Sequence, residues 1–542
     1  MSETNLAEAV IAYLCSKRVQ HIFGIISHSS FSLTDAIAKH PQLRFIYTQH
    51  EGGAGNMALG YARAAGKPAV CLVSAGGGAT NIVTATAQAY KESVPLFVIS
   101  SEIDTASYVK GAWSSWHGID QVRLFQPITK QSLKIERAED LGSVLDALFC
   151  LMTRGRPGPV YLGIPTDVQA AALAAPLIFS ETKHPAAPAI GSQDAETAVD
   201  LLLSAHAPVI LAGTGVHGSG AQKEVQELAE LLRLPVAVSY TAKGVFPESH
   251  PLALGCLGVG GRSYARKFFL ESDLILALGT TFSEGTTLGF GHRTIPDQAR
   301  IIQIDVDPNE LGRNYPSHLA IQADVKGALQ NIIAGVRIRK PAVASDNRRV
   351  QEIQDAKRAW QDERDLSVAS QGMTKDRVLT TLSKLLDGKE SLVTSGITGE
   401  VLRHIDAGSF LIHAGEFRAI GTAFATALGV KLGLPAARVV CVTGDGSFMM
   451  ELQELATARL HNIPVLVIVL RNNAYDRMKR DQLKKYDGRV IGTNLFVPDL
   501  ARLAGLFDAR GFTVTRPDEI EPVFRQGLAS DEFVIVDVHL DS

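Results

Sequence analysis

One segment in the last quarter of the chain restricts the fold more than any other feature. The apolar, β-branched residues 439–443 stop at a glycine turn, residues 444–447, and a helical pattern follows from residue 448 to about residue 460. A second apolar run, residues 464–470, then ends at a polar turn, residues 471–475. Strand, glycine turn, helix, strand and polar turn together make one βαβ unit.

Two polar residues mark the ends of these strands. A right-handed crossover makes the strands parallel, so Asp445 and Asn472 both emerge at the carboxyl edge of the sheet. Their carboxylate and amide oxygens are hard ligands, suited to Mg²⁺ or Ca²⁺. The backbone amides that open the helix after Gly446 form an anion site beside them. The segment therefore predicts a pocket for a diphosphate and its metal ion.

Strands and helices alternate along the whole chain of 542 residues. This alternation predicts an α/β fold with three doubly wound domains and mainly parallel sheets. We place the domains at residues 1–170, 190–340 and 372–542. A stretch that includes Pro176, Pro185 and Pro188 predicts a linker, and the charged residues 347–365 predict a solvated connecting helix. The runs that we assign to strands are residues 21–25, 45–48, 69–73, 96–99 and 160–164 in the first block, 208–213, 235–239, 274–278 and 301–305 in the second, and 392–393, 439–443 and 464–470 in the third.

The first block contains a second chemical signal. Glu51 stands just after a predicted strand and before a helix rich in small residues. On its own, this pattern favours a first-turn helix residue that interacts with the helix dipole. A buried glutamate with a tuned pKa is also suited to proton transfer.

Taken together, the two signals resemble the motifs of the thiamine diphosphate enzymes, in which a Gly-Asp-Gly turn is followed at a set spacing by Asn. Residues 118–122 and 127–130 resemble acetolactate synthases and, more closely, benzaldehyde lyase. The residues near 475–495 resemble sulfoacetaldehyde acetyltransferase. The resemblance covers nearly the whole chain and implies a pyrimidine-binding, a central and a diphosphate-binding domain.

The resemblance also implies roles for individual residues. Asp445, Asn472 and the backbone carbonyl of Ala474 would hold Mg²⁺. Glu51 would hydrogen-bond the N1′ atom of the cofactor's aminopyrimidine and activate the C2 proton for removal. Ile420 would support the cofactor in a bent shape and so assist catalysis. The other cofactor contacts implied are Gly396, Thr398, Arg418, Gly444, Gly446, Ser447 and Tyr475.

Substrate contacts are expected where the chain departs from the family's pattern. His28 and Ser29 lie in the first βα turn, where His28 is either a catalytic group or a solvated loop residue. Trp116 and His117 either line the acceptor side or simply pack. Arg418 could grip a substrate carboxylate, or it could pair with the nearby Glu416.

The central block gives no support for FAD. Acetolactate synthases that bind FAD carry an Asp- and Arg-rich loop where this chain has residues 280–290, and the match is poor. The turn at residues 213–218 resembles half of a dinucleotide fingerprint but lacks its spacing and its acidic partner. It is better explained as a strand-end turn.

Composition excludes several other classes. A net charge of −3 does not favour nucleic acid as a partner, and no apolar run approaches bilayer length. The amino terminus shows no secretory signal, and the five scattered cysteines are typical of core thiols, so we expect a cytoplasmic protein.

The favoured function is a carboligase or decarboxylase that uses thiamine diphosphate and Mg²⁺ and acts on a small 2-oxo acid, similar to acetolactate synthase. The alternatives are a 2-hydroxy ketone lyase similar to benzaldehyde lyase, an enzyme similar to sulfoacetaldehyde acetyltransferase, and a non-catalytic cofactor-binding paralogue. In the family, the first and third domains meet across a subunit interface. The resemblance therefore implies at least a homodimer, and relatives commonly form homotetramers.

Overall fold

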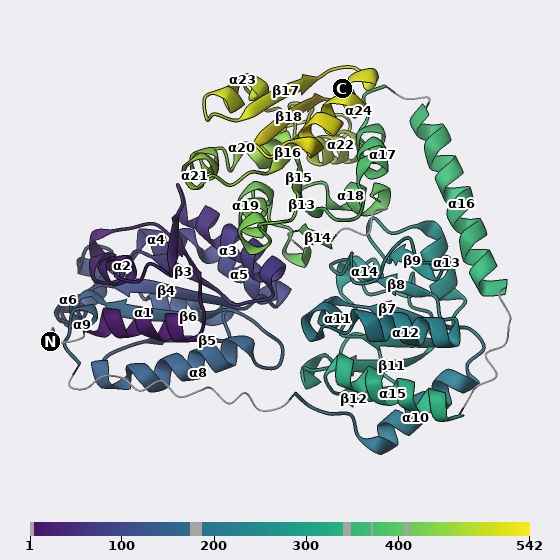
Figure 1. The fold of residues 1–542 in the computed structure, drawn as a ribbon, viewed down its shortest axis with the longest axis horizontal. Helices are drawn as coiled ribbons and strands as arrows, with labels where there is room; N and C mark the ends of the chain where they lie inside the picture. The colour runs from purple at the N-terminus through teal and green to yellow at the C-terminus, as the bar shows by residue number, and fades with distance from the viewer. Residues whose placement is uncertain are drawn as a thin grey trace.

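The computed structural model describes residues 5–173, 187–339, 348–369, 372–405, 410–413 and 415–541. Three α/β domains follow one another along the chain, and each contains a sheet of six strands. In Figure 1 the first domain (purple to blue) and the central domain (teal) lie side by side, with the third domain (green to yellow) above them. All strand pairs in the three sheets are parallel, so the predicted fold class is confirmed.

The first and third domains share one strand order. It is β2-β1-β3-β4-β6-β5 in the first domain and β14-β13-β15-β16-β18-β17 in the third. The central sheet has the different order β12-β11-β10-β7-β8-β9. The outer domains are thus two copies of one topology, which the sequence did not reveal.

The elements of the first domain are α1 (Leu6–Ser16), β1 (His21–Gly24), η1 (His28–Ser30), α2 (Phe31–Ala38), β2 (Arg44–Tyr47), α3 (Glu51–Ala65), β3 (Ala69–Val73), α4 (Gly77–Asn81), α5 (Val83–Glu92), β4 (Leu96–Glu102), α6 (Thr105–Gly111), η2 (Ala112–Ser114), α7 (Gln121–Phe125), η3 (Gln126–Ile128), β5 (Gln131–Lys134), η4 (Ala138–Asp140), α8 (Leu141–Thr153), β6 (Val160–Pro165) and α9 (Thr166–Gln169). Those of the central domain are α10 (Ser192–Ser204), β7 (Pro208–Ala212), α11 (Thr214–Ser219), α12 (Gln222–Leu232), β8 (Val236–Val238), β9 (Ala253–Cys256), α13 (Ser263–Leu270), β10 (Leu274–Leu278), α14 (Glu284–Thr287), β11 (Arg300–Asp305), η5 (Pro308–Glu310), β12 (Leu319–Gln322) and α15 (Val325–Arg339).

The third domain is reached through α16 (Arg348–Ala369), which runs along the outside of the molecule (Figure 1). Its own elements are α17 (Lys375–Leu385), β13 (Ser391–Ser395), α18 (Thr398–His404), β14 (Phe410–His413), η6 (Gly415–Phe417), α19 (Ala423–Gly433), β15 (Val439–Gly444), α20 (Asp445–Met449), α21 (Glu454–His461), β16 (Leu466–Arg471), α22 (Asp476–Lys485), α23 (Leu500–Gly505), β17 (Arg510–Val514), α24 (Pro517–Ala529) and β18 (Val534–His539). The charged segment is therefore helical as predicted, although residue 347 lies outside the described residues. Of the linker prolines, Pro176 and Pro185 lie outside them as well.

One prediction about the βαβ unit is wrong. The helix expected from residue 448 to about 460 is two short helices, α20 and α21, separated at residues 450–453. The break turns Glu451 inward, where its carboxylate accepts hydrogen bonds from the amides of Phe424 and Ala425, in the first turn of α19, at 2.8 and 3.2 Å. A buried carboxylate needs such partners, and they outweigh helix propensity here.

Helices α3 and α19 join the first domain to the third. A Cβ on Gly429 would lie 1.9 Å from the carbonyl oxygen of Met57, and one on Gly60 would lie 2.1 Å from that of Thr426. The glycines let the two helix backbones touch. They pack helix on helix, and a single apolar core continues from Met57 across the interface to Phe424.

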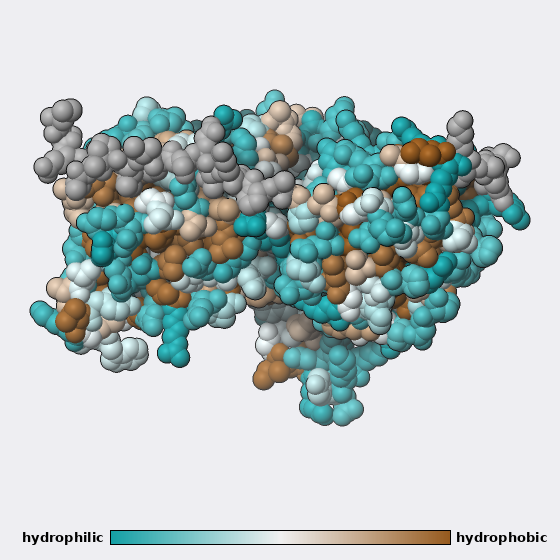
Figure 2. Space-filling model, turned by 90° about the horizontal axis from the view of Figure 1, so that it is seen from below, coloured by the Kyte–Doolittle hydropathy of each residue, from teal (hydrophilic) through white to brown (hydrophobic). Residues whose placement is uncertain are grey.

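None of the helices in the described part of the chain has both the length and the apolar character needed to cross a membrane. Hydrophilic and apolar residues intermix over the face drawn in Figure 2. The cysteines in the structure are free thiols, three of them buried.

Candidate functional site

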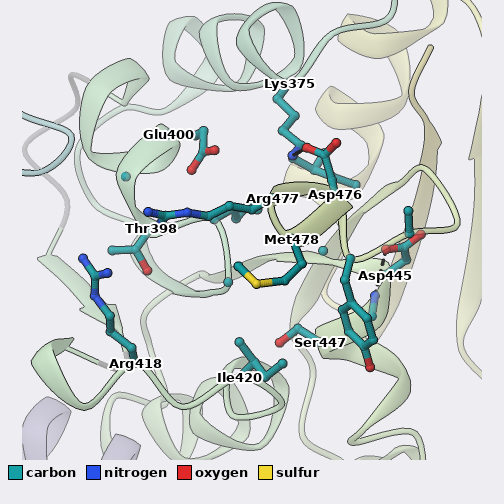
Figure 3. Close-up of a pocket in the computed structure, with 18 of the residues that line it drawn as sticks. Lys375, Thr398, Glu400, Arg418, Ile420, Asp445, Ser447, Asp476, Arg477 and Met478 are labelled. Atoms are coloured by element: carbon teal, nitrogen blue, oxygen red, sulfur yellow. Dashed lines mark hydrogen bonds and ion pairs between the residues drawn. The ribbon is translucent and has the colours of Figure 1, made fainter. Parts of the chain in front are cut away.

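A cavity of about 490 Å³ opens at the carboxyl edge of the third sheet. The loops that follow β13, β15 and β16 form most of its wall, and the central domain adds Tyr240 and Val259. In Figure 3, Asp445 lies at one end and Arg418 at the other, with Met478 and Ile420 between them.

Asp445 is fixed at the end of β15 by the neighbouring strand's loop. Its Oδ2 atom accepts hydrogen bonds from the amides of Asn472, at 3.0 Å, and Asn473, at 2.6 Å. Its Oδ1 atom accepts one from the amide of Gly446 at 2.8 Å. Burial raises the pKa of the Asp445 carboxyl, against the effect of these hydrogen bonds. A cation would offset the cost of a buried charge here.

The loop after β16 is held by a second segment of the same domain. Asn472 Oδ1 accepts a hydrogen bond from the amide of Ala474 at 3.3 Å. Ala474 forms an antiparallel bridge with Asn494, and the amide of Tyr475 donates to the carbonyl of Thr493 at 2.8 Å. The loop's oxygen atoms are therefore held in place beside Asp445.

A space for a ligand lies between the loops after β13 and β15. Gly396 has a φ of +79°, and a Cβ there would face Ser447 at 3.8 Å and Ile420 at 4.0 Å. Ser447 Oγ in turn accepts a hydrogen bond from the amide of Gly421 at 2.8 Å. The backbone of Gly396 therefore forms a wall without a side chain, suited to a close approach by a ligand.

Residues from all three domains hold the loop that carries Arg418 and Ile420. Glu92 in the first domain accepts a hydrogen bond from the amide of Glu416 at 2.9 Å. The Glu416 carboxylate accepts one from Ser283 Oγ of the central domain at 2.6 Å. Glu416 thus binds the central domain, and of the two alternatives for Arg418 the pairing with Glu416 is not seen among the described residues.

Glu454, a buried glutamate of the third domain, contacts the segment that immediately precedes Glu51. Glu454 Oε2 accepts a hydrogen bond from the amide of Gln49 at 3.3 Å, and burial raises the pKa of the Glu454 carboxyl. Glu51 itself begins α3 and is 9% exposed. Its Oε2 atom accepts a hydrogen bond from Asn81 Nδ2 at 2.9 Å. Glu51 is therefore buried and oriented by its own domain.

The other residues predicted in the first domain share one edge of its sheet. His28 is exposed in η1, which follows β1 after three residues, and Ser29 Oγ accepts a hydrogen bond from the amide of Ala75 at 3.4 Å. His117 packs on the turn after β3, where a Cβ on Gly76 would lie 2.8 Å from its carbonyl oxygen, and Trp116 is 90% exposed. None of these residues, nor Glu51, lines the cavity described above.

All the cofactor contacts predicted in the third domain do line it: Gly396, Thr398, Arg418, Ile420, Gly444, Asp445, Gly446, Ser447, Asn472, Ala474 and Tyr475. Sequence reasoning did not select Lys375, Glu400 or Tyr240, which line it too. Tyr240 lies two residues after β8 of the central sheet, and an aromatic residue close to a strand end is the signal that could have identified it.

The residues present fit a diphosphate with its metal ion. The cavity wall places the Asp445 carboxylate with an amide oxygen and a backbone loop, whereas the described residues contain no cluster of three His, Cys, Asp or Glu that could hold a metal ion by itself. A cation at Asp445 would therefore need further oxygen ligands from a bound molecule, which a diphosphate supplies.

Comparison with known proteins agrees with this chemistry. Models of three domains of thiamine pyrophosphate enzymes match the chain in order: the N-terminal TPP binding domain at residues 4–124, the central domain at 195–332 and the C-terminal TPP binding domain at 395–538. The chain belongs to the thiamine pyrophosphate enzyme family.

Within that family the chain is similar to acetolactate synthase large subunits. It is 32% identical to a probable acetolactate synthase large subunit of Methanocaldococcus jannaschii, over 99% of this chain and 92% of the relative. It is 31% identical to the acetolactate synthase isozyme 3 large subunit of Escherichia coli, over 99% of this chain and 94% of the relative.

The central domain's glycine turn has a structural role. A Cβ on Gly213 would lie 2.1 Å from the carbonyl oxygen of Gly279, so the turn after β7 packs directly on the end of β10. This contact explains the glycine without a nucleotide and agrees with the interpretation as a strand-end turn.

Proposed function

We propose that this enzyme uses thiamine diphosphate and Mg²⁺ to decarboxylate a small 2-oxo acid and to join the remaining carbon unit to a second carbonyl compound. The observation that supports the proposal is the cavity that gathers Asp445, Asn472 and Ala474 with the bare backbone of Gly396. The full-length similarity to acetolactate synthase large subunits supports it independently.

Each part of the cavity wall has a separate task in this proposal. Asp445, Asn472 and the carbonyl of Ala474 hold the cation, and Gly396 with Ser447 borders the diphosphate. Thiamine diphosphate, when bound, supplies the carbon that adds to the keto group and takes up the electrons released with CO₂. Ile420, 46% exposed in the cavity, presents an apolar surface to the bound cofactor and keeps water from it.

Glu51 completes the site from a second copy of the chain. It must hold a proton at N1′ of the aminopyrimidine, yet the described residues that line the cavity belong to the central and third domains. The first domain bears Glu51 on an edge that also exposes Trp113 and Trp116, 93% and 90% accessible. We therefore propose a homodimer at least, with a tetramer of paired dimers as the larger assembly.

The function is tested by incubating the protein with thiamine diphosphate, Mg²⁺ and a panel of 2-oxo acids, with and without aldehyde acceptors. We expect CO₂ release and a new 2-hydroxy ketone, both lost in the Asp445→Ala variant. If the protein instead only cleaves 2-hydroxy ketones, it is a lyase of the benzaldehyde lyase kind. If no 2-oxo acid is consumed, the proposal is wrong.

A further inference from the structure

The charges around the cavity are separated between its two ends. Asp445 and the loop after β16 lie at one end, and the guanidinium groups of Arg418 and Arg477 lie at the other in Figure 3. Glu400 is the acidic side chain drawn near them. The end remote from the metal ligands therefore has two cationic groups and one anionic group.

Arg418 occupies a backbone position that normally favours glycine. Its φ is +58°, in the left-handed region, and the loop is fixed there by the bonds of Glu416 to Glu92 and Ser283. The side chain is exposed, and within the described part of the chain its guanidinium carbon lies 6.0 Å from the centre of the Tyr240 ring and forms no ion pair. Such strain at a site wall is a reason to look for a role for the side chain.

Arg477 is a second guanidinium without an acidic partner among the described residues. It lies in the first turn of α22, directly after the metal-binding loop, and it is exposed. The two acidic side chains of this helix are already paired: Asp476 with Lys375 at 2.6 Å, and Asp481 with Lys485 at 3.4 Å. Arg477 is thus available to a ligand.

A substrate's reacting carboxylate is a poor partner for these arginines. Its negative charge disappears as CO₂ leaves, so a strong ion pair would stabilise the ground state more than the transition state and would slow the reaction. An anionic group that does not react keeps its charge throughout, and binding it costs nothing in the chemical step.

The geometry points to a specificity site: Arg418 and Arg477 together bind a second, non-reacting anionic group of the substrate, a carboxylate, sulfonate or phosphonate. This inference rests on the proposed function, because it concerns the substrate of the same cavity. It predicts that the enzyme prefers substrates with an anionic tail to those whose tail is neutral and of equal size.

The test compares matched substrates. 2-Oxoglutarate and its neutral amide, 2-oxoglutaramate, serve as donors, while succinate semialdehyde and its amide serve as acceptors. For at least one pair, kcat/KM should be about tenfold or more higher for the anion, since a charged hydrogen bond of this kind is worth that much. Arg418→Gln and Arg477→Gln should each lower that preference, because each should raise KM for the anionic substrate more than KM for its neutral partner. Analogues with sulfonate and phosphonate tails then identify the preferred anion.

A binding measurement separates this inference from the proposed function. Titration calorimetry of the cofactor-free protein with glutarate should give a signal that both substitutions weaken and that Arg489→Gln, outside the cavity, does not. If glutarate binding depends on the arginines but no 2-oxo acid is turned over, the specificity site stands and the proposed reaction is wrong.

Two results would overturn the inference. Equal use of charged and neutral substrates by the wild type is one of them. The other is a loss of thiamine diphosphate affinity in the arginine variants that slows both substrates alike, because the arginines would then hold the cofactor's diphosphate.

Discussion

The backbone amide of Asn472 donates a hydrogen bond to Asp445 Oδ2 at 3.0 Å, which connects the ends of two neighbouring strands, β15 and β16. The proposed metal ligands are therefore held at a short separation before any cation binds. Preorganisation of this kind lowers the cost of binding, because the ligand oxygens need not be gathered from a flexible loop.

The first prediction concerns this carboxylate. Asp445→Asn keeps the size of the side chain but removes its charge, so affinity for Mg²⁺ with thiamine diphosphate should fall by about tenfold or more. Titration calorimetry measures the loss, and circular dichroism should show an intact fold. Asp531→Asn, an exposed aspartate in the same domain, is the control. Unchanged affinity in Asp445→Asn would exclude the metal-ligand role.

Glu51→Gln should separate binding from turnover. The amide can still face Asn81 and the cofactor, so cofactor affinity should persist, but it cannot hold the proton that activation requires. We expect turnover to fall by about 10²-fold or more. Hydrogen–deuterium exchange at C2 of the bound cofactor reads this step directly. As the control, Glu139→Gln changes an exposed glutamate and should leave the exchange rate unchanged. A normal exchange rate in Glu51→Gln would refute the role of Glu51 in activating the cofactor.

Glu451 should make stability depend on pH. Burial raises the pKa of its carboxyl from 4.5 to about 8. Between these values the folded protein keeps a proton that the unfolded chain releases, so stability decreases as pH rises through this window. The slope is at most about 1.4 kcal/mol per pH unit for one group. In Glu451→Gln this contribution is absent.

Thermal unfolding at a fixed protein concentration measures the effect. From pH 5 to pH 8, the melting temperature of Glu451→Gln relative to wild type should rise steadily. The exposed Glu532→Gln should follow the wild-type profile. Parallel profiles for wild type and Glu451→Gln would show that Glu451 does not titrate in this range.

Gly429→Ala tests the junction of the first and third domains. Its Cβ would lie 1.9 Å from the carbonyl oxygen of Met57, and backbone atoms cannot move aside cheaply. We expect a loss of about 1–3 kcal/mol, or several degrees in melting temperature. Gly218→Ala in α11, where a Cβ meets nothing within 4 Å, should be neutral or stabilising. Equal stability of the two variants would contradict the proposed close contact.

Sequence patterns identified the inner strands except β18, and among the edge strands they identified β2 alone. The buried, β-branched strands β3, β10 and β15 were predicted within a residue of their bounds. Strands β5 and β12 were missed, because edge strands are half exposed and carry polar residues such as those of Gln131–Lys134. The shared order of the outer sheets could not be found either, because it depends on contacts between strands distant in sequence.

For the site as well, local sequence patterns predicted some residues, and the others depend on contacts between distant parts of the chain. Asp445 and Asn472 were found because strand ends in one βαβ unit meet at one edge. Tyr240 of the central domain lines the cavity, and Glu92 of the first domain holds the loop at Glu416. No local sequence pattern predicts these contacts between domains. The break between α20 and α21 was also unpredictable, since it depends on Glu451 reaching amides in α19.

Complementation between two inactive variants tests the central claim most directly, that one site is built from two chains. Glu51→Gln and Asp445→Ala are each expected to be inactive. After subunit exchange at equal amounts, half the dimers are hybrids with one intact site each, so about a quarter of wild-type activity should return. Exchange is verified with differently tagged chains. A mixture that forms hybrids but stays inactive, or a wild-type enzyme that is active as a monomer, would contradict the account.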